Sequence, residues 1–130
     1  MPGDGIIARA LQLVAIAEVA ENLRAVPTHA APFTERERAY AFSKSDPDRR
    51  LAARLAAKRA ARTALDPTLA LEEFEVVPAR GGPPQLLLSE RAARRASERG
   101  VERILLSLTH GLTHAAALVL LVGEGAGGRP

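Results

Sequence analysis

The sequence of 130 residues has no cysteine and no tryptophan, and its aromatic side chains are only one tyrosine and three phenylalanines. Without cysteine the chain forms no disulfide bond, no thiolate metal site and no cysteine nucleophile. Nucleic-acid bases stack on aromatic side chains that lie among cations, and this chain has too few aromatics for such a platform. We therefore expect no nucleic-acid partner.

Long hydrophobic runs are also absent. No stretch approaches the roughly 20 apolar residues that a membrane-spanning helix needs, and the N-terminus lacks a basic segment followed by an uninterrupted apolar one. We expect a cytoplasmic protein without a membrane partner. The length fits one domain, which we place at residues 1–122, and the glycine-rich residues 123–130 are expected to form a flexible tail.

Lysine is scarce as well, because all but two of the 18 basic residues are arginines. The net charge is +3 and the pI is about 10.2. The guanidinium group matches phosphate and carboxylate oxygens with a planar fork of donors. This bias favours acidic partners, either phosphate-bearing ligands or an acidic protein.

The spacing of apolar residues and the capping residues predict a strand followed by helices, then two strands, a helix and two more strands. The predicted strands cover about 10–16, 73–77, 85–88, 103–110 and 114–122, and the predicted helices cover 17–25, 35–44, 47–65 and 89–100, with a loop from Pro27 to Pro32. Thr34 with Glu37 has capping-box spacing, Asp46 before Pro47 is an N-cap at a helix start, and Ser89 is the expected cap of the fourth helix. The second and third of these strands are expected to form one hairpin, and the last two are expected to form another. The fold class is therefore α+β, with an antiparallel sheet packed on a long helix.

The long helix carries the most informative motif, four cations between residues 54 and 62. At 100° per residue, Arg54, Lys58 and Arg62 share a sector with leucines, while alanines fill the opposite side. Like charges at i, i+4 spacing cost a helix about 0.2–0.5 kcal/mol per pair. This ladder therefore indicates a bound anion, although a solvated arginine-rich face remains an alternative.

Three motifs in order then resemble one family. They are Phe33-Thr34-x-x-Glu37, the segment from Ala53 to Lys58, and Leu106-Ser107-Leu108-Thr109-His110. Together they resemble the holo-acyl-carrier-protein synthases, with the pattern F-T-x-x-E, A-x-R-F-A-A-K-E-A, G-K-P and S-[IL]-[ST]-H. The resemblance covers about residues 8–122.

The resemblance implies a phosphopantetheinyl transferase-like fold and activity. Such a 4′-phosphopantetheinyl transferase moves the phosphopantetheine arm of coenzyme A to a serine of an acidic acyl carrier protein. The resemblance also implies a trimer with the cleft between protomers. The candidate coenzyme A-binding residues are Arg54, Lys58, Arg59, Arg62, Gly82, Pro84, Ser107, Thr109 and His110. Of these, Lys58 and His110 are the catalytic candidates.

The sequence departs from the family at its metal site. The N-terminal pattern G-[IL]-G-x-D-[IL]-V places Gln12 where the metal-binding aspartate belongs, and Arg59 replaces the glutamate of A-A-K-E-A. Four residues after that glutamate the family commonly has a lysine, and this chain has Thr63 there. The family's G-K-P motif corresponds to Gly82-Pro83-Pro84, so its lysine is also missing. Mg²⁺ prefers carboxylate oxygens, so an amide and a guanidinium should not bind it. The positive charge of Arg59 would instead replace part of the charge that the metal ion supplies beside a pyrophosphate.

Three functions remain open. The first is a repurposed or regulatory protein that binds coenzyme A and an acyl carrier protein without ordinary Mg²⁺-dependent transfer. The second is an active transferase, with Mg²⁺ held by phosphates and waters or by carboxylates that the sequence does not place, for example Glu18 or Glu37. The third is a structural subunit that pairs with an intact paralogue, instead of a homotrimer.

Other charged residues are assigned simpler roles. His114 is expected to be structural, and Asp46, Asp48 and Glu37 are expected to be caps and surface charges. The arginines of the fourth helix, Arg91, Arg94, Arg95 and Arg99, are expected to form a solvated face, although an acidic carrier protein would suit it.

Overall fold

The computed structural model describes residues 5–25 and 32–124. Its elements are β1 (Ile6–Ala15), α1 (Ile16–Ala25), α2 (Glu35–Phe42), α3 (Pro47–Leu65), a 3₁₀ turn η2 (Leu71–Glu73), β2 (Phe74–Val77), β3 (Gln85–Leu88), α4 (Glu90–Glu98), β4 (Val101–His110) and β5 (His114–Gly123). The predicted α+β class is confirmed. No helix of the described residues is long and apolar enough to cross a membrane.

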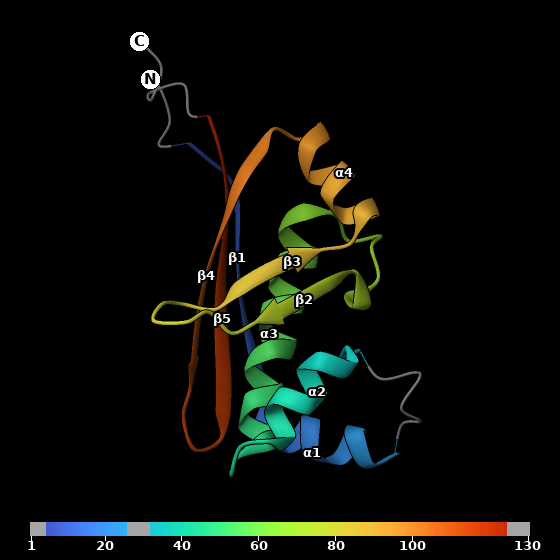
Figure 1. Ribbon diagram of the computed structural model, residues 1–130, viewed down its shortest axis with the longest axis vertical. Helices are drawn as coiled ribbons and strands as arrows, with labels where there is room; N and C mark the ends of the chain where they lie inside the picture. The colour runs from blue at the N-terminus through green and yellow to red at the C-terminus, as the bar shows by residue number, and fades with distance from the viewer. Residues whose placement is uncertain (1–4, 26–31, 125–130) are drawn as a thin grey trace.

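The main sheet is antiparallel, with strand order β1-β5-β4, and α3 packs along one of its faces (Figure 1). Both predicted hairpins are present, because β4 pairs with β5 and β2 pairs with β3. The β2–β3 ribbon crosses the other side of α3 (Figure 1). The long helix thus lies between the main sheet on one side and α1, α2 and β2 on the others.

Strand β1 begins at Ile6, four residues earlier than the sequence predicts, because its partner β5 is long enough to pair with it from Ala15 back to Ile6. The predicted tail also begins too early. Gly123 belongs to β5, and its N–H donates to the carbonyl of Gly5 at 2.9 Å. Residues 125–130 and most of the predicted loop from Pro27 to Pro32 lie outside the described residues.

Alternation along the strands gives the main sheet two different faces. The inner face turns to α3 and is formed by the small or branched side chains of Val14, Leu106, Ala115, Ala117, Val119 and Leu121, all buried. The outer face carries exposed apolar residues, among them Leu11 and Leu13, which are 69% and 66% exposed. The alanines of α3 allow the helix to approach the small inner residues closely.

Helix α3 is more buried than its helical spacing suggests. The leucine sector and the alanine sector are both buried, and from Leu51 to Ala61 every residue is buried except Arg59. The sequence pattern implies one buried side, but the sheet and the smaller elements cover the helix almost all round. Two members of the cation ladder, Arg54 and Lys58, are therefore buried.

The predicted caps are correct at two of three helices. Thr34 and Glu37 form the capping box of α2, and Ser89 accepts from the N–H of Ala92 at the start of α4. Asp46 precedes Pro47 as predicted, but its side chain does not cap α3. It accepts instead from Nε of Arg50 at 3.0 Å.

Candidate functional site

Lys58 is the centre of a buried ion pair. Its Nζ lies 2.7 Å from Oε1 of Glu37, and both side chains are 0% exposed. Glu37 also accepts from the N–H groups of Thr34 and Val76, at 2.9 and 2.7 Å. Burial lowers the pKa of Lys58, against the opposing effect of Glu37. In this position the Lys58 side chain is enclosed by the fold, and Glu37 is not the surface charge that the sequence suggests.

Arg54 is also buried, at 4% exposure, but it has no acidic partner. Its guanidinium lies 4.4 Å from the centre of the Tyr40 ring, and Nη1 donates to the carbonyl of Arg50 at 3.3 Å. Its Nε has no hydrogen-bond partner, and no carboxylate of the described residues pairs with it. Burial lowers the pKa of Arg54, since desolvation disfavours its charged form. A buried cation without a counter-ion is costly, so this position is suited to an external anion.

Arg54 lines a cleft of about 240 Å³. The cleft lies where α2 and the first half of α3 meet the β2–β3 turn and β4, and its lining residues are Tyr40, Arg50, Arg54, Pro78, Ala79, Gly82, Pro84 and Leu108. Three residues predicted from the sequence, Arg54, Gly82 and Pro84, therefore share one cleft. A second guanidinium, that of Arg50, contacts Asp46 and lies 3.5 Å from the Tyr40 hydroxyl.

His110 lies close to this cleft, whereas Ser107 and Thr109 do not. The hydrogen bond from Arg50 lowers the pKa of Asp46, and a smaller contribution comes from His110, so His110 lies near the start of α3. His110 pairs with Ala115 on the inner face of the sheet. Ser107 and Thr109 pair with Leu118 and Ala116 on the outer face. A single chain therefore does not gather the whole predicted set.

Arg59 and Arg62, the remaining predicted residues, lie elsewhere on α3. Nη2 of Arg59 lies 2.8 Å from Oε2 of Glu18, the acidic residue in the first turn of α1. These two side chains are 33% and 36% exposed. The guanidinium of Arg62 is partly exposed and makes no hydrogen bond or ion pair within the described segments.

The metal-site position of the family pattern offers no set of anionic ligands. Gln12 lies on the inner face of β1, paired with Ala117. Arg59 projects from the helix that packs against this strand, and Glu18 is already engaged by Arg59. Among the described residues no three His, Cys, Asp or Glu side chains lie together in a way that would hold a metal ion. A hard dication such as Mg²⁺ does not fit this donor set.

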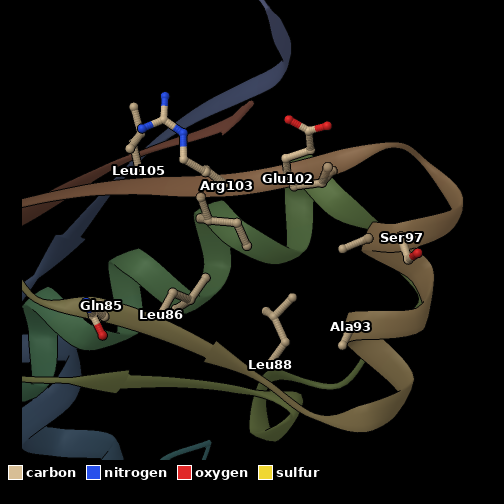
Figure 2. A pocket seen from close by; sticks show the side chains of 11 residues that line it. Gln85, Leu86, Leu88, Ala93, Ser97, Glu102, Arg103 and Leu105 are labelled. Carbon is tan, nitrogen blue, oxygen red and sulfur yellow. The ribbon is translucent and has the colours of Figure 1, made fainter. Parts of the chain in front are cut away.

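A second cavity, of about 460 Å³, is distinct from this site. It lies between β3, α4 and β4, and Leu86, Leu88 and Ala93 face into it (Figure 2). The side chains of Glu102 and Arg103 extend from β4 away from the space between β3 and α4 (Figure 2). None of the residues predicted from the sequence lines this cavity, and no cluster of cations converges in it. It therefore lacks the charges that a phosphate ligand needs.

Comparison with known proteins decides the family. A holo-acyl-carrier-protein synthase from Anaeromyxobacter sp. (strain K) is 38% identical over 126 residues, which cover 92% of this chain and 98% of the relative. The chain belongs to the holo-acyl-carrier-protein synthase family. Two solved structures are each 31% identical: the ACPS–CoA complex of Chronobacterium ammoniagenes, with a TM-score of 0.76, and the acyl carrier protein synthase of Mycobacterium tuberculosis, with a TM-score of 0.74. This chain covers 96% of the first and 99% of the second, and they cover 89% and 92% of it. No family model matches the chain.

Two features of the site are not revealed by the motifs. Tyr40 and Arg50 complete the cleft around Arg54, and Glu18 binds Arg59. Arg50 precedes Arg54 by four residues, so extending the i, i+4 ladder by one step would have found it. No local signal identifies Tyr40 or Glu18, because their contacts join separate helices.

Proposed function

We propose that this holo-acyl-carrier-protein synthase homologue binds coenzyme A through the cleft around Arg54 and takes an acyl carrier protein as its partner, without ordinary Mg²⁺-dependent transfer. The observation that carries the proposal is the buried Arg54 guanidinium, which lines a cleft and has no carboxylate partner among the described residues. The coenzyme A complex of the Chronobacterium ammoniagenes protein supports the choice of ligand.

The chemistry of the cleft suits a phosphate group. A phosphate oxygen placed at Nε of Arg54 would accept the hydrogen bond that this atom lacks, and it would offset the desolvated charge. Arg50 supplies a second guanidinium, although Asp46 offsets part of its charge. The exposed imidazole of His110 lies nearby, so we retain it as a candidate contact for the ligand. Lys58 acts on this site only by holding α2, α3 and β2 together.

The contacts of two carboxylates weigh against the active-transferase alternative. Glu37 is fully buried, and its oxygens accept from Lys58, Thr34 and Val76. Glu18 is bound to Arg59. The two carboxylates that would hold Mg²⁺ in that alternative are thus both engaged by cations of the chain itself. An active enzyme would have to hold the ion through phosphates and waters or through other carboxylates of the chain.

We further propose that a second copy of the chain covers the outer face of the main sheet, as in the trimer that the family resemblance implies. This face exposes Ile7, Leu11, Leu13, Leu105 and Leu118. A contiguous apolar face of this kind is unusual on a monomer. Ser107 and Thr109 lie on the same face, so an assembly would bring them to a boundary between protomers. The alternative, pairing with an intact paralogue, would use the same surface.

The transfer test is incubation of the protein with coenzyme A, Mg²⁺ and an acidic apo-carrier protein, followed by intact-mass analysis of the carrier protein. We expect no gain of the phosphopantetheine mass, because Gln12 and Arg59 leave no anionic metal ligands. An intact holo-acyl-carrier-protein synthase in a parallel reaction serves as the positive control. Efficient Mg²⁺-dependent modification would favour the active transferase.

The binding test is calorimetry with coenzyme A at low and high salt. Binding should weaken strongly with salt, since the contact is between a phosphate and cations. Replacing Arg54 by glutamine should weaken binding by about tenfold or more. Arg94→Gln is the matched control, because Arg94 is exposed on α4 and pairs only with Glu90 among the described residues. Equal effects of the two variants would mean that the charge acts only as a diffuse field.

A further inference from the structure

The exposure pattern of α3 singles out Arg59. In the eleven-residue stretch from Leu51 to Ala61 it is the one residue that is not buried, although the helix runs through the centre of the molecule. Its ion pair with Glu18 is partly exposed, and such pairs contribute only about 0–1 kcal/mol to stability. Stability alone therefore gives little reason for an arginine at this position.

The guanidinium of Arg59 is anchored by Glu18, but most of its hydrogen-bond donors are unused among the described residues. Its Nη2 donates to Oε2 of Glu18 at 2.8 Å, and its other N–H groups make no hydrogen bond with any described residue. Glu18 therefore holds the Arg59 guanidinium through one N–H group, and the remaining N–H groups are available to another acceptor. A guanidinium in this state binds two oxygens of a phosphate without first losing its anchor.

From these observations we infer that Arg59, anchored by Glu18, is a permanent positive charge for the diphosphate group of the ligand, so that the chain binds coenzyme A without a divalent cation. This inference rests on the proposed function, since it names how the same ligand is held. It follows from the misfit between the residues present and Mg²⁺: Gln12 is neutral, Arg59 is cationic, and Glu18 is occupied.

The charges of this site set the direction of each effect. Arg59 and Glu18 together are neutral, so Glu18 anchors the guanidinium but also repels a diphosphate. In the Glu18→Gln variant the amide oxygen still accepts the hydrogen bond, and the repulsion is gone. Removal of the Arg59 charge leaves Glu18 unpaired beside the ligand. The two substitutions should therefore change the affinity for coenzyme A in opposite directions.

Arg54 and Arg59 are separate parts of the binding surface. Five residues of helix separate them by about 7.5 Å along the axis and about 140° around it. Coenzyme A carries a diphosphate and, apart from it, a phosphate on the ribose. Adenosine 3′,5′-bisphosphate keeps the inner phosphate but lacks the outer one and the pantetheine arm, so comparison of the two ligands shows how much of the effect of Arg59 requires the complete diphosphate.

The experiment is calorimetry of the full chain with coenzyme A, in EDTA and again in Mg²⁺. We expect equal affinities in both buffers. Arg59→Gln should weaken binding of coenzyme A by about tenfold in either buffer, and Glu18→Gln should strengthen it by about threefold. Neither effect should exceed twofold with adenosine 3′,5′-bisphosphate. The control is again Arg94→Gln, which breaks an Arg–Glu pair on another helix.

A gain-of-metal variant provides a second readout. Gln12→Asp combined with Arg59→Glu would place two carboxylates at the site and release Glu18 as a third. Coenzyme A binding by this double variant should require Mg²⁺, whereas binding by the wild-type chain should not. Adding Thr63→Lys tests whether transfer then follows, since the family commonly has lysine there.

The outcomes separate the two proposals. Coenzyme A binding by the wild-type chain only in Mg²⁺, or an Arg59→Gln variant that behaves like Arg94→Gln, would overturn the role of Arg59 and leave the cleft around Arg54 standing. An equal loss with adenosine 3′,5′-bisphosphate would also overturn it, because the charge would then act at long range. Absence of coenzyme A binding in both buffers would overturn the proposed function together with this inference.

Discussion

At the scale of single residues, adjacent cations of one helix have different tasks. Arg54 faces a cleft without a counter-ion, Lys58 is paired inside the core, and Arg59 is partly exposed beside Glu18. The sequence shows only that all are basic. What each cation does depends on which neighbouring element supplies, or fails to supply, a carboxylate.

Lys58→Met should destabilise the fold by about 3–5 kcal/mol, because it leaves Glu37 charged and buried without a partner. Urea unfolding measures this change. The double variant Lys58→Met with Glu37→Gln should recover most of the loss. A neutral amide needs no counter-ion, and its oxygen still accepts from the N–H of Val76, which Glu37 contacts at 2.7 Å. If the double variant is no more stable than the single one, the ion pair is not the reason for the loss.

At the scale of elements, the arginines of α4 are mostly structural. Arg95 pairs with Asp66 and Glu98, Arg91 lies 3.9 Å from Glu73, and Arg94 contacts Glu90. Arg99 reaches the end of α3, where its Nη1 donates to the carbonyls of Ala64 and Leu65 at 2.6 and 2.7 Å. It thereby satisfies acceptors that the last turn of a helix leaves open. The predicted solvated face is in part a contact between two helices.

Arg99→Ala should therefore lower the free energy of unfolding by about 1–2 kcal/mol, which is the cost of leaving such carbonyls without a charged donor. Thermal or urea unfolding measures the loss. Arg94→Ala, at an exposed position of the same helix, should change it by less than about 0.5 kcal/mol. Equal losses in both variants would mean that helix propensity, and not the cap, sets the effect.

At the scale of the whole molecule, the main sheet is covered on only one side. Helix α3 packs on the inner face, and the exposed Leu11, Leu13 and Leu118 remain on the outer one. The register places Leu11 opposite Leu118, so these side chains form one continuous patch across β1 and β5. Burial of this patch in an assembly would give a favourable hydrophobic contribution.

We expect the chain to be oligomeric in solution, with a mass by light scattering above that of the 13.8 kDa monomer. Leu11→Lys should shift it to the monomer, because a charge would have to be buried against apolar groups. Glu21→Lys, at an exposed position of α1, is the charge-changing control and should leave the mass unchanged. A monomeric wild-type chain would contradict assembly with itself, and co-purification with a paralogue would then be the remaining form of the proposal.

Local sequence patterns were enough to predict the α+β class, both hairpins, the limits of α3, and the caps at Thr34 and Ser89. These features depend on contacts between residues near one another in the chain, so alternation, helical spacing and turn residues are enough to predict them. The family resemblance, together with the cation ladder, supplied Arg54, Gly82 and Pro84, which do share a cleft.

Which charges are free to bind a ligand depends on contacts between residues that are far apart in the sequence. Glu37 and Lys58 are 21 residues apart, and Glu18 and Arg59 are 41 residues apart. Their pairing depends on how α1 and α2 pack against α3, and no local pattern encodes that packing. The same packing buries both sides of α3 and turns Ser107 and Thr109 away from it. Desolvation and ion pairing depend on every neighbour in space, so whether a cation is free to bind a ligand is a property of the folded molecule.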